Sequence, residues 1–353
     1  MTRTAFLLFI MSGIMFGLSG CTTVSYVAQS LGGHVQIMTA RKSVDKLIAS
    51  PSTPAPLRSQ MQAAASIRQF ATDELDLPDN SSYRSYADIG RDYVTWAVFA
   101  APEFSLVPRV WCFPVFGCVP YRGYFSPEAA VAYARDLKGQ GLDVHVSGVT
   151  AYSTLGWSSD PLLSTMFRHD RTYLAGLVFH ELAHQRVYIE GDSAFNEAFA
   201  VAVETTGVER WLQSNGDSEG LRSYRTDQQR DKDFLGLIAR TRDELQAIYQ
   251  AASPPERKRA SKAAAIDRLR ARYRRMRDGR WNGYSGYDGW IDRPINNAKL
   301  AATAVYSDLV PAFLRLFQIC DGEYPRFYAA VRRIGSIGRG QRIEALKSAE
   351  TCE

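Results

Sequence analysis

Two histidines and a glutamate in the middle of the chain have the types and the spacing of a zinc site. Residues 180–184 read HExxH and follow the apolar stretch 174–179. On a helix, residues four apart lie on the same face, so the imidazoles of His180 and His184 can bind a single Zn²⁺. The carboxylate of Glu181 can then reach a water molecule at the metal. The pattern predicts a catalytic zinc site with Glu181 as general base and acid.

A catalytic zinc site needs a third protein ligand, and its identity decides the class of enzyme. The chain is not a metzincin, because the extended motif HExxHxxGxxH would need a glycine at Val187 and a histidine at Glu190. Gly191 and Asp192 should end the helix, and a second helix that returns antiparallel would bring Glu197 beside the histidines. We expect Glu197 to be the third ligand, with Asp192 and Glu190 as weaker candidates.

The motif and its surroundings carry a family resemblance. HExxH followed by Asn196-Glu197 resembles the gluzincin metallopeptidases, whose glutamate ligand comes from the next helix. Residues 152–157, 160–162 and 174–185 look like a family of bacterial lipoproteins described as predicted aminopeptidases. The resemblance implies a zincin-like fold, one zinc ion and a peptide substrate. Only 12 residues separate His184 from Glu197, fewer than in the better-known gluzincins.

The same resemblance suggests how the oxyanion would be stabilised. In gluzincins a downstream tyrosine or histidine often has this role, and the helix expected at 296–306 offers Tyr306, with Asn297 as a lesser candidate. Glu181 would take a proton from the attacking water and deliver it to the leaving amine. The substrate backbone could pair with an edge strand near residues 146–151.

Glu204 and two other acidic residues have open roles. Glu204 lies seven residues after Glu197 on the same helix face, so it is either a hydrogen-bond partner of a ligand histidine or a surface charge. An aminopeptidase also needs an anionic pocket for the α-ammonium group of its substrate. Glu190, Asp192 and Glu204 are near in sequence, and the choice between exopeptidase and endopeptidase stays open.

The elements that must position this site change character along the chain. Helical spacing predicts a hairpin from helices at 34–50 and 57–77, and the aromatic and β-branched stretch 93–125 predicts strands. Ser126-Pro127 opens a helix that ends near Gly139, residues 142–146 alternate like a strand, and the chain is almost entirely helical from Arg171 onward. We therefore expect an α+β fold, with a small sheet in a mixed N-terminal half and a mainly helical C-terminal half carrying the HExxH helix. The expected divisions are an N-terminal helical segment at 21–92 and a zincin-like metallopeptidase domain at 93–353.

The first residues resemble a bacterial lipoprotein signal. Arg3 precedes an apolar run at 5–16 and then Leu18-Ser19-Gly20-Cys21. The resemblance implies removal of residues 1–20 and acylation of Cys21. Thr22, the residue after Cys21, is not an aspartate. In such lipoproteins this favours the outer membrane, so the resemblance predicts a protein that is anchored there by lipid and faces the periplasm.

Four cysteines remain in the mature chain. An even number in an exported protein suggests disulfides, and we expect the local pairs Cys112 with Cys118 and Cys320 with Cys352. A zinc cluster is the alternative, but no CxxC pair supports it.

The positive charge is concentrated in one segment. The 353 residues include 46% hydrophobic and 22% charged residues, which excludes a disordered or fibrous chain. Residues 256–280 hold eleven Lys or Arg against three acids and have the spacing of an amphipathic helix. The exported location argues against nucleic acid, so anionic lipid head groups are the expected contact unless the helix is simply solvated. The Gly-rich and aromatic loop 281–290 is either a lid or an ordinary packed loop.

These observations favour a lipid-anchored zinc metallopeptidase, in particular an aminopeptidase of gluzincin type. The alternative is a lipoprotein that keeps the zincin scaffold but acts as a binding or envelope-assembly factor without proteolysis. The presence of Glu181 between the histidines favours the enzyme, because a scaffold needs no base there.

Overall fold

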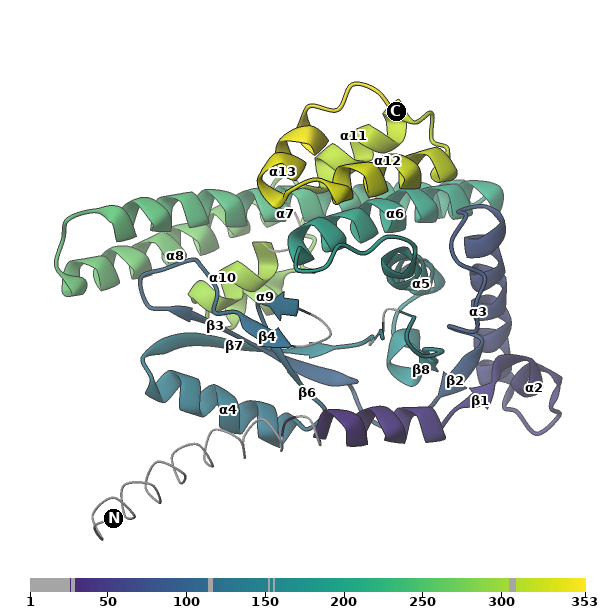
Figure 1. Cartoon of the computed structure of the whole chain (residues 1–353). Helices are drawn as coiled ribbons and strands as arrows, with labels where there is room; N and C mark the ends of the chain where they lie inside the picture. Colours follow the sequence, from purple (N-terminus) through teal and green to yellow (C-terminus); the bar gives the residue numbers. More distant parts are fainter. Residues whose placement is uncertain (1–25, 27–28, 114–116, 152, 155, 305–308) are drawn as a thin grey trace, which may run out of the picture.

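Strands occupy the first half of the chain and helices the second. The computed structural model describes residues 26, 29–113, 117–151, 153–154, 156–304 and 309–353. Among these residues every strand lies before position 164, and helices follow one another from Arg171 onward (Figure 1). The predicted α+β class is therefore confirmed.

An antiparallel sheet of three strands lies between one short helix and the long helices. Its order is β6 (Arg122–Tyr124), β3 (Thr95–Pro102) and β7 (Leu142–Val149). Thr95 pairs with Val149 and Pro102 with Leu142, which makes β7 an edge strand of this sheet. The helix α4 (Pro127–Gly139) packs against β3 and β7 and begins where the Ser126 hydroxyl accepts a hydrogen bond from the Ala129 amide. The predicted helix and strand of this region are both present.

The N-terminal helical hairpin differs in part from the prediction. The helix α3 (Ala55–Asp73) matches the second predicted helix, but the segment 34–50 is not one helix. Its helical part ends at Thr39, and β1 (Lys42–Ser43) then pairs with β2 (Ser85–Ala87). The Ser43 side chain caps the short helix α2 (Val44–Ala49) by accepting a hydrogen bond from the Lys46 amide. Pairing with β2 thus overrides a helical periodicity that the sequence continues.

Two further small sheets complete the strands. The strand β8 (Leu162–Leu163) pairs in parallel with β2, and β4 (Trp111–Phe113) pairs with β5 (Gly117–Val119). A disulfide between Cys112 and Cys118 joins β4 to β5. A second disulfide joins Cys320 to Cys352, so both predicted pairs are confirmed.

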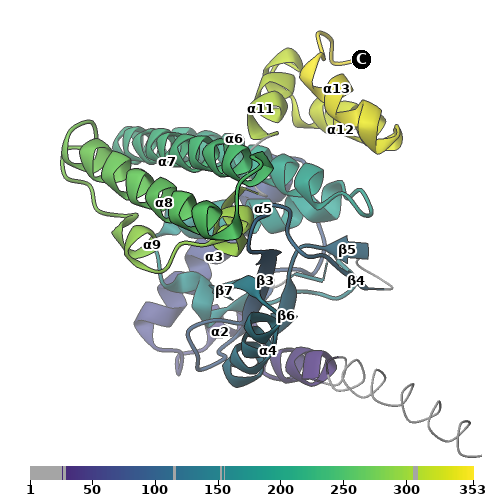
Figure 2. The ribbon, with the colours of Figure 1, turned by 90° about the vertical axis from the view of Figure 1, so that its left-hand side faces the viewer.

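The helical half forms layers above the sheet (Figures 1 and 2). The helix α6 packs on α5, α7 and α8 form a long hairpin, and α11 to α13 lie on the side of α6 away from the sheet. The elements are the 3₁₀ turn η1 (Ser164–Phe167), α5 (Arg171–Arg186), α6 (Ser193–Ser214), α7 (Ser218–Gln250), α8 (Pro255–Asp278), α9 (Asp288–Asp292), α10 (Asn297–Ala304), α11 (Val310–Ile319), α12 (Tyr324–Ser336) and α13 (Arg339–Lys347).

The helix α5 is the centre of the main core. The apolar residues that precede the HExxH sequence are buried, and Val178 and Phe179 are fully buried. The helices α3 and α6 both pack on α5. The core therefore holds the backbone of the motif in place.

The basic segment 256–280 lies mostly in α8, as predicted, but eight of its eleven cations contact acids or backbone oxygens within the protein. Arg268 and Arg272 bind Glu244 of α7, and Lys262 binds Asp143 at the start of β7. The other contacts are made by Lys258, Arg259, Arg270, Arg277 and Arg280. In the described part of the chain, no helix has the length and apolar character needed to cross a membrane.

Candidate metal centre

The helices α5 and α6 are positioned by a short turn that hydrogen bonds of Asn196 and Asp192 hold in place. The Asn196 side chain binds both backbone groups of Ile189, accepting from its N–H and donating to its C=O at 2.8 Å each. The Asp192 carboxylate caps α6 by accepting a hydrogen bond from the Phe195 amide. Gly191 has φ +74°, a conformation that favours glycine. These contacts turn the chain so that α6 returns antiparallel along α5.

Three predicted ligands converge across these helices. His180 Nε2 lies 3.2 Å from His184 Nε2 and 3.3 Å from Glu197 Oε2, and His184 Nε2 lies 3.7 Å from Glu197 Oε1. In a tetrahedral site with bonds of about 2.0–2.1 Å, neighbouring ligand atoms are about 3.3 Å apart. The three side chains therefore fit one zinc ion without rearrangement. His184 is 7% exposed and Glu197 22%, so the centre is recessed but open on one side.

Glu204 contacts the opposite ring nitrogen of His180. Its Oε2 lies 3.0 Å from His180 Nδ1, which leaves Nε2 directed at the other two candidate ligands. Gly176 makes room for this carboxylate, because a Cβ atom there would lie 3.1 Å from Glu204 Oε1. Glu204 is thus a hydrogen-bond partner of His180 and not a surface charge.

The charges of this group stabilise one another. Burial alone would lower the pKa of His180, but hydrogen bonds to Glu197 and Glu204 outweigh it and raise that pKa well above its ordinary value. Burial would raise the pKa of Glu197, but its hydrogen bonds with His180 and His184 hold it far below the usual range. The same carboxylates that stabilise an imidazolium would stabilise a bound cation.

Glu181 interacts electrostatically with residues of three loops, Tyr83, Tyr121 and Asp160, and no sequence pattern pointed to the two tyrosines. Burial raises the pKa of Glu181, partly offset by the charges of His180 and His184. The charges of Glu181 and Asp160 act on the buried Tyr83, and those of Glu197 and Glu181 act on Tyr121. Tyr83 and Tyr121 lie in loops outside the motif, so no spacing rule connects them to the histidines.

The buried Asp160 organises the loop that precedes β8. Its carboxylate accepts hydrogen bonds from the amide and the hydroxyl of Thr154, at 2.9 and 2.8 Å. Asp160 belongs to a segment that carried the family resemblance, and this was the signal that could have placed it near the site.

The other residues that the sequence suggested for the site either have different partners or lie outside the described part of the chain. Asp192 is not a third ligand, because its carboxylate is buried against Arg342 of α13, and Glu190 is exposed. The Asn297 side chain donates to the carbonyls of Pro102 and Glu103 and accepts from Tyr249, so it has no donor left for an oxyanion. Tyr306, the predicted oxyanion residue, and Cys21, the predicted lipidation site, lie outside the described residues.

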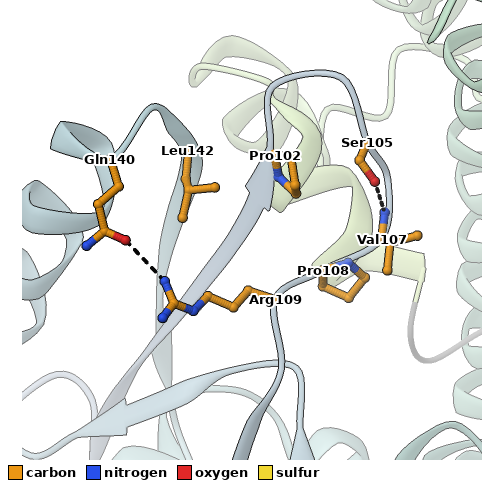
Figure 3. A pocket seen from close by; sticks show the side chains of 7 residues that line it. All are labelled: Pro102, Ser105, Val107, Pro108, Arg109, Gln140 and Leu142. Carbon is orange, nitrogen blue, oxygen red and sulfur yellow. Dashed lines mark hydrogen bonds between the residues drawn. The ribbon is translucent and has the colours of Figure 1, made fainter.

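A separate hollow of about 520 Å³ lies at the other end of the sheet. Its lining includes Pro102, Pro108 and Leu142 (Figure 3). The only charged side chain in the lining is Arg109, which donates a hydrogen bond to Gln140 Oε1. This hollow shares no residue with the group around His180.

A comparison with protein families supports the predicted resemblance to an aminopeptidase family. The model of a family described as "Putative aminopeptidase" matches residues 25–346, which is most of the chain. The chain belongs to this family. The family name indicates a peptidase that acts on peptide substrates. No curated protein and no solved structure matches the chain.

Proposed function

We propose that this protein is a zinc-dependent aminopeptidase of gluzincin type with a zincin-like fold. The observation that carries the proposal is the convergence of His180, His184 and Glu197, whose ligand atoms all lie within 4.8 Å of one another. A zinc ion bound by these residues would act as a Lewis acid and lower the pKa of a water molecule toward about 7. The family name supports the choice of a peptide as substrate.

The side chains have distinct tasks in this proposal. Glu204 holds the proton on His180 Nδ1 and so fixes the tautomer that leaves Nε2 free to bind. Glu181 accepts a proton from the attacking water and returns it to the leaving amine. Its partial burial favours this exchange, because burial raises the pKa of its carboxyl toward the working pH. The strand β7 is an edge strand, and a substrate backbone could pair with its outer edge.

Recognition of the substrate amine has fewer candidates than the sequence offered. The Asp192 carboxylate is neutralised by Arg342, and Glu204 is engaged by His180. Of the three acids near the motif, only the exposed Glu190 has no ion pair among the described residues. The aminopeptidase assignment therefore depends mainly on the family.

A digest of a peptide library tests the reaction. We compare the wild type with Glu181→Gln and with Glu219→Gln, an exposed control on α7. The wild type should release N-terminal residues from free peptides, and Glu181→Gln should lose nearly all activity while keeping about one equivalent of zinc. Equal cleavage of free and N-acetylated peptides would refute the exopeptidase assignment. Undiminished activity of Glu181→Gln would refute the mechanism.

We also propose that Cys21 is lipidated and that the protein is anchored in the outer membrane, facing the periplasm. The order of Arg3, the apolar run and Cys21 supports this proposal, as do two disulfides typical of an oxidising compartment. Three cations of α8 without a partner among the described residues, Arg257, Arg274 and Arg275, are available to anionic lipid. Cys21→Ala should move the protein from the membrane fraction to the soluble one; unchanged fractionation would contradict the anchor.

A further inference from the structure

The helix at residues 29–39 has an exposed side without charged residues. No Asp, Glu, Lys or Arg occurs between positions 22 and 40. Leu31 and Val35, one helical turn apart, are 60% and 57% exposed. The opposite side of the helix holds it to the protein, because Ile37 is buried and Gly33 lies against the Phe125 ring. An exposed helix face is normally polar, so this one is suited to a partner outside the described chain.

Cations follow this helix directly. Arg41, Lys42 and Lys46 are exposed, and Asp45 is the only acid between positions 22 and 46. Figures 1 and 2 show the helix, in dark purple, at the lower edge of the molecule, with α8 on the other side of the three-stranded sheet. The apolar face therefore ends in a group of positive charges, which complements an anionic surface.

A hydrogen bond links the end of the helix to the loop that carries Trp157. Arg41 Nη1 donates to the Ser159 carbonyl at 3.1 Å. Trp157 is 80% exposed, although its loop is fixed by hydrogen bonds from the Trp157 amide to the Thr154 carbonyl and from the Ser158 amide to the Thr154 hydroxyl. Tryptophan is enriched where membrane meets water.

We propose that the helix at 29–39, the cations after it and Trp157 form a docking face for an anionic phospholipid membrane. Leu31, Val35 and Trp157 enter the boundary between head groups and acyl chains, and the cations contact lipid phosphates. The inference rests on the proposed lipid anchor. Cys21 precedes Gln29 by eight residues, which span at most about 28 Å, so acylation of Cys21 would hold this face close to the bilayer.

Binding to vesicles tests the apolar part of the docking face. The protein is used as Cys21→Ala, without its lipid, and sedimented with vesicles of phosphatidylethanolamine and phosphatidylglycerol. Adding Leu31→Ser and Val35→Ser should weaken binding about 10-fold. The matched control adds Val107→Ser and Val110→Ser, at positions 72% and 56% exposed, and should bind as before. Because all four side chains are exposed, Tm should change little in either variant.

Two further measurements test the charges and Trp157. Lys42→Gln with Lys46→Gln should weaken binding about 10-fold on the anionic vesicles and leave binding to phosphatidylcholine vesicles unchanged. Vesicles with brominated acyl chains should quench the fluorescence of Trp157, and Trp157→Phe should remove most of that quenching. The other five tryptophans are partly or fully buried.

Each result decides a different point. Equal binding of the Leu31→Ser, Val35→Ser variant and its control would overturn the docking face. Loss of binding only in Arg274→Ala with Arg275→Ala would also overturn it, because the contact would then belong to α8. A Cys21→Ala protein that forms dimers through Leu31 and Val35 and binds no vesicles would show that the face joins two copies of the chain. Because the vesicle test needs no lipid on Cys21, failure of the anchor would leave its result standing.

Discussion

At the residue scale, the side chain of His180 lies between two carboxylates, and each of them has a different role in the candidate metal centre. Glu197 lies on one side of the ring and Glu204 on the other, at 3.3 and 3.0 Å. One carboxylate shares a prospective cation with the imidazole, and the other fixes its tautomer. Removing each of them should therefore have a different effect.

Glu204→Ala should weaken zinc binding without abolishing it. The expected loss is about 10- to 100-fold in affinity, the usual cost of losing an outer hydrogen-bond partner of a metal ligand. Glu209→Ala is the matched control, because Glu209 is on the same helix but pairs with Arg225. Zinc affinity can be measured by competition with a chelator. Equal affinity of Glu204→Ala and the control would show that His180 does not need this partner.

Gly176→Ala tests the same contact from the neighbouring helix. The added Cβ would lie 3.1 Å from Glu204 Oε1 and 3.2 Å from its Cγ, so the carboxylate must shift. Alanine is the better helix former, so α5 itself should not be weakened. We expect Gly176→Ala to lose less zinc affinity than Glu204→Ala. The double variant should lose no more zinc affinity than Glu204→Ala alone. Additive losses would mean that Gly176 acts elsewhere.

Sequence spacing predicted that His180, His184 and Glu197 come together, because their approach depends on two local rules. Residues i and i+4 share a helix face, which places His180 beside His184, and the helix break at Gly191 returns Glu197 to them. The sequence could not decide whether Glu204 contacts a histidine or is a surface charge, because the contact depends on how closely α5 and α6 approach each other. Tyr83 could not be predicted, because nothing in the local sequence relates its loop to α5.

At the scale of elements, α6 is held by the C-terminal helices as well as by α5. The Asp192 carboxylate both caps α6 and pairs with Arg342 of α13, and the two side chains are only 5% and 9% exposed. A buried pair of this kind is costly to break on one side, because the remaining charge stays in the protein.

Arg342→Met should destabilise the protein by about 3–5 kcal/mol, the usual cost of an unpaired buried charge. Adding Asp192→Asn should recover much of that loss, because asparagine keeps the cap without the charge. Urea unfolding of the two single variants and the double variant measures the coupling. If the double variant is as unstable as the sum of the singles, the pair does not act as a unit.

His145 on β7 should make folding stability depend on pH. Burial, together with the charges of Lys299 and Arg293, lowers the pKa of His145 to about 4 from an ordinary 6.5. Between these values the unfolded chain binds a proton that the folded protein does not, so stability is lost as the pH falls from about 6.5 toward 4. His145→Gln should reduce this loss, whereas His169→Gln, at an exposed position, should not. Unfolding free energies at pH 7 and pH 5 give the comparison, and equal pH dependence in all three proteins would refute the prediction.

At the scale of the whole molecule, composition predicted the order of strands and helices better than their exact bounds. The change from β-branched and aromatic residues to helical spacing after Arg171 is a strong signal, because each period extends over many residues. The prediction of one helix over 34–50 was wrong. The strand β1 that interrupts it has only two residues, too few to show a strand pattern in the sequence. The sequence could not show that eight of the eleven cations in 256–280 have partners within the protein, because several partners lie on other elements, such as Glu244 on α7 and Asp143 on β7.

The two disulfides should contribute unequally to the stability of the whole fold. In the chain-entropy model, a disulfide that closes a loop spanning 32 positions stabilises by roughly 3.7 kcal/mol, whereas one spanning 6 positions stabilises by roughly 2.2 kcal/mol. The longer one also ties the end of the chain to α11 and so keeps α13, with Arg342, against Asp192. We expect Cys320→Ala with Cys352→Ala to lower the free energy of unfolding more than Cys112→Ala with Cys118→Ala, and to weaken the coupling between Asp192 and Arg342. Urea unfolding under oxidising conditions measures both effects, with the wild type in reductant as the reference for losing both bonds. An equal or smaller loss for the longer loop would mean that α11 to α13 hold α6 without help from the covalent bond.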